Sequence, residues 1–355
     1  MPEQLMTAVS VRGPGDMTWE RIARPTRGAG QLLVRVERLG VCGTDVHLLD
    51  GTMGYIAEGL TTYPFQPGHE WCGVVVECDG PERAGEIRDA DSAVRVGDRV
   101  VGEPFLSCGT CDLCRAGHRD QCLARDEMGV RGESAGAAAE YIVVPRENVV
   151  VVPSHVDATA AVLAEPLVTA LHALSVVHTS PGESLGIVGA GTLGLLAAQV
   201  ASASGVRVTL YARGDRAKRA ASVGADFVFV DQAEESAHDA VLEMSGGGGA
   251  FEFCLRVVKP TGRVALVGVA STRQPVDTSL VVTKGITIAG VLGGIRFLPH
   301  AMHLIAAGIV RADAIVDDIL PFAQYSEAIA RVAGGAMMRP KVLLDLSERS
   351  ADAAQ

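Results

Sequence analysis

The sequence predicts an α/β protein of two domains, in which a β-rich domain precedes a doubly wound parallel sheet. Up to residue 157, short valine-rich segments alternate with glycine-rich turns, a pattern typical of strands. From residue 158 onward, helical and strand-like segments alternate, which indicates a mostly parallel sheet with helices on both faces. The length of 355 residues supports this division, because it exceeds what one ordinary core accommodates.

The first domain is expected to carry its function in its loops. Residues 50–66 and 80–95 show no strand pattern, and long loops of this kind often bind ligands. The strands predicted around them are Leu32 to Leu39, Gly73 to Glu77, Asp98 to Val101 and Ala139 to Val144.

The second domain is expected to open with an alanine- and leucine-rich helix over Ala158 to Val177. Its predicted strands are Leu185 to Val188, Arg207 to Tyr211, Phe227 to Val230, Ala240 to Met244, Arg263 to Val267 and Thr287 to Val291, with helices from Thr192 and from Asp215. Residues 231–238 are too few for the ~10–12 residues of a helical crossover, so we expect a trimmed sheet edge there. After Gly294 an amphipathic helix and a last strand, Lys341 to Leu344, follow. The predicted divisions are residues 1–157, 158–294 and 295–355, the last of which returns to the first domain.

Composition limits the classes of partner. The net charge of −11 argues against nucleic acid and anionic membranes, which need clustered positive charge. The start, MPEQLMTAVS, lacks the features of a secretory signal, and we expect no apolar run of the ~18 residues that span a membrane. We therefore expect a cytoplasmic protein, in which eight cysteines indicate metal binding or chemistry sooner than disulfides.

Four cysteines form the most specific local motif, Cys108-x2-Cys111-x2-Cys114-x7-Cys122. Four thiolates this close together can enclose one tetrahedral Zn²⁺ with no open position, which defines a structural site. Four thiolates can also hold an iron–sulfur cluster. Arginines and aspartates are balanced in this loop, whereas a zinc-ribbon binding module would have basic surroundings.

Further metal ligands are scattered along the chain. Cys42 lies in GVCGTDVH, His69 and Glu70 in PGHE, and Glu165 in AEPL. Each alone is weak evidence, since a single cysteine is usually a small buried hydrophobe. Together they supply a thiolate, an imidazole and two carboxylates, a ligand set that suits an open, catalytic zinc site.

A glycine-rich turn ends the first strand of the second domain and opens a helix. The pattern GxGxxG in this βαβ setting is typical of dinucleotide binding, because the glycines allow a tight turn, close approach of the pyrophosphate and close helix packing. The helix N-terminus then offers N–H groups to the phosphates. The residues predicted to bind the cofactor here are Gly189, Gly191, Thr192, Leu193 and Gly194.

The end of the next strand predicts which nicotinamide cofactor is used. An acidic residue there would bind the ribose 2′-hydroxyl of NAD, but this strand runs into Ala212 and Arg213. An arginine at this place can pair with a 2′-phosphate. We therefore expect NADP to be preferred, with NAD as the alternative.

The motifs GVCGTDVH, PGHE, the four cysteines, AEPL and the glycine-rich turn occur in an order that resembles the zinc-containing medium-chain alcohol dehydrogenases. Within this family the sequence looks most like the polyol (sorbitol) and threonine dehydrogenase branch. The resemblance covers nearly the whole chain and implies a GroES-like catalytic domain, a Rossmann domain, and a homodimer or homotetramer. The cofactor expectation departs from the branch, whose sorbitol and threonine enzymes mostly use NAD.

Carried over residue by residue, the resemblance implies that Cys42 and His69 are ligands of the catalytic zinc, with Glu70 or Glu165 as the third. Thr44 would contact the zinc-bound oxygen and His47 would pass the released proton toward solvent. The loop at residues 51–62 would border the substrate, and its Tyr55 and Glu58 could contact hydroxyl or amino groups.

The function expected is a zinc-dependent oxidoreductase that moves a hydride between NADP(H) and a secondary alcohol or ketone. Its small-molecule substrate would be a polyol, a cyclitol or sugar-like ring, or an amino alcohol. The alternatives are an NAD-dependent threonine or simple diol dehydrogenase, and a zinc-stabilised binding module. The module leaves Cys42, His69, Glu70 and the glycine-rich turn without a role.

Overall fold

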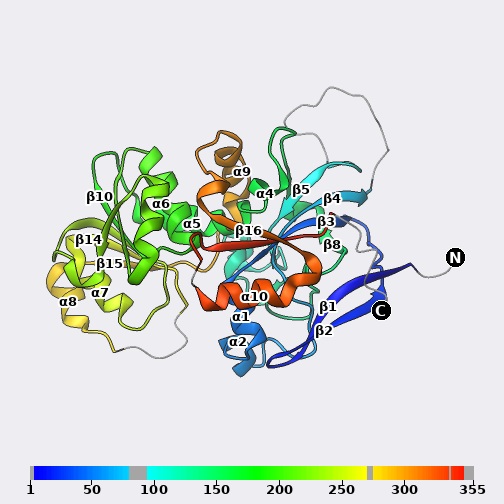
Figure 1. The fold of residues 1–355 in the computed structure, drawn as a ribbon. Coiled ribbons are helices and arrows are strands. Elements are labelled where there is room, and N and C mark those ends of the chain that lie inside the picture. Colours follow the sequence, from blue (N-terminus) through cyan, green and yellow to red (C-terminus); the bar gives the residue numbers. More distant parts are fainter. Residues whose placement is uncertain (1–3, 80–93, 270–274, 336, 348–355) are drawn as a thin grey trace. The chain divides into compact units, whose positions relative to one another are not determined.

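The computed structural model describes residues 4–79, 94–269, 275–335 and 337–347. The chain forms two compact units (Figure 1). Unit 1 comprises residues 1–165, 318–335 and 341–355, and unit 2 comprises residues 166–317 and 336–340. The return to unit 1 therefore begins at residue 318, whereas the sequence analysis placed it at residue 295. Most of the loop predicted at residues 80–95 lies outside the described residues.

Unit 1 is built on a seven-stranded sheet in the order β16-β17-β3-β4-β5-β9, with β8 paired to β3. Its strands are β3 Gln31–Val41, β4 Glu70–Glu77, β5 Arg99–Gly102, β8 Tyr141–Pro145, β9 Val149–Val151, β16 Val316–Pro321 and β17 Lys341–Asp345. Two antiparallel pairs accompany the sheet, β1 Leu5–Gly13 with β2 Asp16–Ala23, and β6 Phe105–Leu106 with β7 Asp126–Glu127.

Short helices follow the strands of unit 1: α1 Gly43–Leu49, α2 Gly54–Ala57, α3 Asp112–Arg115, α4 Ala158–Ala161 and α10 Tyr325–Gly334. The central strand β3 is valine- and leucine-rich and almost wholly buried, as expected for a strand paired on both edges. Helix α10 covers α1 and β17, and its Tyr325 is among the largest fully buried side chains.

Unit 2 holds a six-stranded parallel sheet in the order β12-β11-β10-β13-β14-β15. Its strands are β10 Ser184–Val188, β11 Arg207–Ala212, β12 Asp226–Phe229, β13 His238–Glu243, β14 Val258–Leu266 and β15 Thr287–Gly290. The α-helices of this part of the chain are α5 Ala164–Val177, α6 Thr192–Ala203, α7 Ala250–Val257, α8 Thr278–Lys284 and α9 Leu298–Ala306. This doubly wound sheet is the predicted one.

Successive residues of β10 show how both faces of the sheet are covered. Val188 belongs to a core cluster with Phe253 of α7, whereas Ile187 contacts α6 beside Gly194. Neighbouring residues of a strand point to opposite faces, so α6 and α7 lie on different sides.

Two predictions for unit 2 need correction. The predicted single helix from Ala158 is broken into α4 and α5, and the segment from Asp215 is a 3-10 helix, Gly214–Val223. Residues 230–237, all of them described, contain no α-helix, as predicted from their small number. The predicted trimmed sheet edge is not observed, because the edge strand β12 pairs with β11 along its whole length.

One stretch, Ala158–Val177, is long and apolar enough to cross a membrane by length and composition, contrary to expectation. However, 67% of the 18-residue window that meets this criterion is buried inside the structure. A buried core helix also has this length and apolar composition, because it is apolar on most sides.

Candidate functional site

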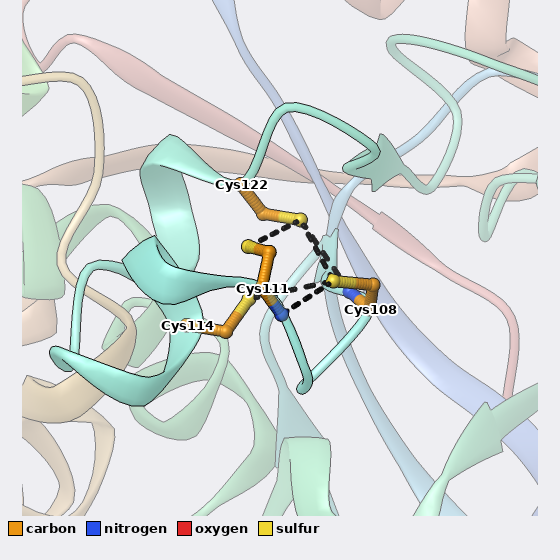
Figure 2. Close-up of side chains that lie close together, drawn as sticks. All are labelled: Cys108, Cys111, Cys114 and Cys122. Carbon is orange, nitrogen blue, oxygen red and sulfur yellow. Dashed lines mark hydrogen bonds between the residues drawn. The ribbon is translucent and has the colours of Figure 1, made fainter.

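Four cysteine side chains of unit 1 converge, as Figure 2 shows. The sulfurs of Cys108 and Cys122 are 3.5 Å apart, and those of Cys108–Cys114 and Cys111–Cys122 are 3.9 Å apart. All four thiols are free, so no disulfide joins them. Backbone N–H groups of Thr110 and Cys111 lower the pKa of Cys108 to about 6, which favours its thiolate. Four convergent sulfurs suit a tetrahedral metal ion with no open position.

A second group of potential ligands consists of Cys42, His69 and Glu70, whose ligand atoms all lie within 4.8 Å of one another. Cys42 is the N-cap of α1, directly after β3, while His69 precedes β4 and Glu70 begins it. The antiparallel register pairs Glu70 with Gly40. A Cβ atom at position 40 would lie 2.2 Å from the Glu70 carboxylate, so only glycine leaves room for it.

Asp45, which the sequence analysis did not single out, orients two of these residues. Its Oδ2 accepts the backbone N–H of Cys42 at 2.8 Å, and its Oδ1 lies 3.3 Å from Nδ1 of His69. Burial alone would lower the pKa of His69, but the Asp45 carboxylate outweighs it and raises that pKa well above its usual value. This contact leaves Nε2 of His69 available, which is the usual arrangement of a metal-binding histidine.

A buried lysine was also missed by sequence reasoning. Nζ of Lys341 lies 2.7 and 2.6 Å from the two carboxylate oxygens of Glu70 and 3.1 Å from the carbonyl oxygen of Val41. Lys341 is 1% exposed and Glu70 is 2% exposed. The only local signal was a lysine at the start of an apolar strand.

Glu165 lies in the first turn of α5 and is nearly buried. Burial raises its pKa to about 7, with Glu70 adding to the effect and His69 opposing it. Glu165 therefore interacts with the second group electrostatically, although it is not among the residues whose ligand atoms meet within 4.8 Å.

The two residues predicted to relay protons lie on α1. The hydroxyl of Thr44 is 3.8 Å from the sulfur of Cys42. His47 is half exposed, and its Nδ1 is 2.8 Å from the hydroxyl of Thr52, which donates to Asp50 at 2.6 Å. This chain of polar groups ends at the protein surface, where a proton can reach solvent.

The glycine-rich turn of unit 2 has the predicted geometry. Gly189 adopts φ +116°, which favours glycine, and a Cβ atom on Gly194 would lie 1.9 Å from the Gly189 carbonyl oxygen. Gly191 is the N-cap of α6, whose first turn contains Thr192 and Leu193. The N–H groups of this turn are available for phosphates.

A cavity of about 560 Å³ opens beside this turn. It is lined by Gly189, by Ala212 and Arg213 at the end of β11, and by Ser245 after β13. Arg216, which sequence reasoning did not select, also lines it. The cavity thus joins the glycine-rich turn to three arginines, since Arg256 also lines it, and is large enough for an adenosine.

Two family models match the chain. Residues 28–154 match the alcohol dehydrogenase GroES-like domain, and residues 192–307 match the zinc-binding dehydrogenase domain. The L-threonine 3-dehydrogenase of Saccharopolyspora erythraea is 33% identical over 340 residues, covering 92% of this chain and 94% of that protein.

Solved structures agree in fold. A Sinorhizobium meliloti protein described as a zinc-binding dehydrogenase bound to NADP has a TM-score of 0.85 at 27% identity, covering 97% of this chain and 100% of its own. Galactitol-1-phosphate dehydrogenase of Escherichia coli has a TM-score of 0.82 at 25% identity, covering 96% of this chain and 100% of its own.

Proposed function

We propose a cofactor and a substrate class for this chain, which belongs to the zinc-containing medium-chain alcohol dehydrogenase family and is a zinc-dependent alcohol dehydrogenase. It prefers NADP and acts on a secondary alcohol of a polyol, sugar-like or amino-alcohol substrate. The observation that carries the cofactor proposal is Arg213, which lines the cavity beside the glycine-rich turn. Its guanidinium can pair with a 2′-phosphate, as can that of Arg216.

The donors present fit two zinc ions. Cys108, Cys111, Cys114 and Cys122 would hold a structural ion. Cys42, His69 and Glu70 would hold the catalytic ion. Glu165 would hold the molecule that occupies the open coordination position of the ion, or would exchange with that molecule. When bound, catalytic zinc supplies Lewis acidity to the alcohol or carbonyl oxygen.

Thr44 and His47 would move the alcohol proton. The Thr44 hydroxyl lies beside Cys42 and would relay the proton by donating its own hydroxyl proton onward as it accepts that of the substrate oxygen. His47, linked through Thr52 to Asp50, would deliver it to solvent. Meanwhile the turn at Gly189 and the N-terminus of α6 would hold the cofactor phosphates, so that the hydride passes to nicotinamide.

Replacing Arg213 with alanine tests the cofactor proposal. We expect the KM for NADPH to rise about 10–100-fold, because a charge-assisted pair contributes about 1.5–3 kcal/mol, while the KM for NADH stays within about threefold. Steady-state kinetics with both cofactors measures the difference. An equal loss with NADPH and NADH would refute the assignment.

A second candidate is NAD-dependent oxidation of L-threonine, which the 33% identical threonine dehydrogenase favours. A screen of polyols, cyclitols and amino alcohols with both cofactors separates the two candidates.

We further propose a cytoplasmic homodimer or homotetramer that binds neither nucleic acid nor membrane.

Zinc placement is tested by metal analysis of variants of the two carboxylates. Glu70→Gln should lose the catalytic ion, whereas Glu165→Gln should retain two ions per chain and lose kcat. The reverse pattern would exchange their roles.

A further inference from the structure

We propose that Arg131 of unit 1 binds an oxyanion, a carboxylate or a phosphate, that is part of the alcohol substrate. This inference rests on the proposed dehydrogenase function and narrows its substrate class to anionic secondary alcohols. It depends on the place, the contacts and the charge of Arg131.

The turn that carries Arg131 lies against the backbone that presents His69. The N–H of Ala137 donates to the carbonyl oxygen of Gly68 at 2.7 Å. A Cβ atom on Gly129, two residues before Arg131, would lie 2.7 Å from that same oxygen. This turn therefore packs directly against the residue that precedes His69.

The loop that follows Cys42 also contacts the Arg131 turn. The N–H of Met53 donates to the carbonyl oxygen of His47 at 3.0 Å, which joins α2 to α1. The N–H of Gly132 donates to the carbonyl oxygen of Leu60 at 2.9 Å, which joins this loop to the Arg131 turn. The guanidinium of Arg131 lies 5.9 Å from the ring centroid of Tyr55, on α2. The Arg131 turn thus contacts both the backbone that leads into His69 and the loop that follows Cys42.

The guanidinium of Arg131 has no carboxylate partner among the described residues. Its Nη1 donates to the backbone carbonyl of Arg125 at 3.0 Å, and its Nε is buried without an acceptor. Three other arginines of unit 1 also bury an Nε without an acceptor, but each holds a carboxylate through another nitrogen: the pairs are Arg24–Glu77, Arg27–Asp79 and Arg38–Asp345.

The neighbouring acids contact other groups, although Oδ1 of Asp126 is buried without a donor. Glu127 lies 2.6 Å from Nε of Arg125, whose Nη2 donates to the Tyr55 hydroxyl at 3.1 Å. The Asp126 carboxylate accepts the N–H and the hydroxyl of Ser134, at 3.1 and 2.8 Å. Arg131 is therefore the arginine of this cluster without a carboxylate within salt-bridge distance among the described residues, although Glu127 and Asp126 balance the charges of Arg125 and Arg131 overall.

Such an arrangement is suited to an anion. Buried charged donors normally have acceptors, and a guanidinium fits a carboxylate or a phosphate with two parallel hydrogen bonds. A neutral polyol would leave the charge of Arg131 unpaired. Binding energy from an anionic group would also orient the alcohol for hydride transfer.

Matched ligand pairs test the proposal without requiring turnover. Calorimetry on the protein loaded with zinc and NADP would compare L-threonine with L-threoninamide, and galactitol 1-phosphate with galactitol, with acetate and inorganic phosphate as minimal probes. The variants are Arg131→Gln, Arg131→Lys and the exposed control Arg115→Gln, whose side chain is 70% exposed.

In the wild-type protein we expect one anionic probe to bind at least about tenfold more tightly than its neutral counterpart. Arg131→Gln should weaken that probe about 10–100-fold and leave neutral ligands within about threefold, Arg131→Lys should retain part of the preference, and the control should behave as wild type. For any probe that is turned over, the KM should rise in Arg131→Gln with kcat little changed. The threonine and phosphate arms identify which oxyanion is bound.

Equal binding of anionic and neutral probes by the wild-type protein, or equal losses for both in Arg131→Gln, would overturn the inference. The proposed function fails differently, by lack of cofactor reduction with every alcohol in the absorbance assay. Anion binding that depends on Arg131 would survive that failure.

Discussion

Replacing Lys341 with methionine should destabilise metal-free protein strongly. Lys341 is as buried as Glu70, and its ammonium group touches both oxygens of that carboxylate. Methionine has a similar length and no charge, so the variant keeps the packing while leaving the Glu70 carboxylate buried without a counter-ion.

The size of the effect follows from burial. Removing one partner of a fully buried ion pair costs about 3–5 kcal/mol, because the remaining charge loses its compensation in a medium that solvates it poorly. At about 2–4 °C per kcal/mol, the melting temperature of unit 1 should fall by about 6–20 °C. Glu70→Leu in the same chain should restore most of this loss, since no uncompensated charge then remains buried.

Denaturant unfolding in the presence of a chelator measures these differences. The control is Lys259→Met, which breaks a 2.7 Å pair with Asp239 whose side chains are 38% and 27% exposed. Such a pair is worth about 0–1 kcal/mol. The reasoning would be wrong if Lys341→Met cost no more than the control, or if the double variant were as unstable as the single one.

Two further predictions concern unit 2. Burial, aided by Lys259, lowers the pKa of His238 to about 4, so between pH 6.5 and 4 the unfolded chain binds a proton that the folded chain does not. The free energy of unfolding should therefore fall by about 3 kcal/mol as the pH drops across that window, and His238→Gln should flatten the profile in denaturant titrations; parallel profiles would contradict this. Gly194→Ala should destabilise the cofactor-free protein by at least about 2 kcal/mol, since its Cβ would clash with the Gly189 carbonyl oxygen at 1.9 Å. Gly191→Ala, which meets open space, should leave the melting temperature unchanged, and equal shifts for the two variants would count against the close packing of α6.

The fold was predictable where its signal is local. The alternation of strand-like and helical segments located β10 and β11 to within a residue or two, and the glycine-rich turn fell at the junction of β10 and α6. The confirmed family resemblance likewise depended on short motifs. The 3-10 helix after β11 was mistaken for an α-helix, because composition alone does not distinguish i→i+3 from i→i+4 hydrogen bonding.

The candidate site was less predictable, because the pairing register of the strands places the groups that contact its proposed metal ligands. Strand β17 pairs Val342 with Val41, and β4 pairs Glu70 with Gly40 on the other edge of β3. Lys341 therefore meets Glu70 across a strand that lies 300 positions away in sequence. No local pattern encodes that register, so Lys341 could be seen only as the start of a strand.

The charges around the proposed zinc ligands also explain why a buried cation, Lys341, contacts Glu70. Cys42, Asp45, Glu70 and Glu165 are acidic groups gathered in one largely buried region, where Lys341 is the one lysine that contacts them among the described residues. Burial raises the pKa of Glu165 to about 7, with Glu70 adding to the effect while His69 and Lys341 oppose it. A divalent ion bound by Cys42, His69 and a carboxylate would add positive charge beside these acids, and Lys341 would balance Glu70 whether or not the ion is bound. We therefore expect Lys341 to hold the Glu70 carboxylate in place in the metal-free protein.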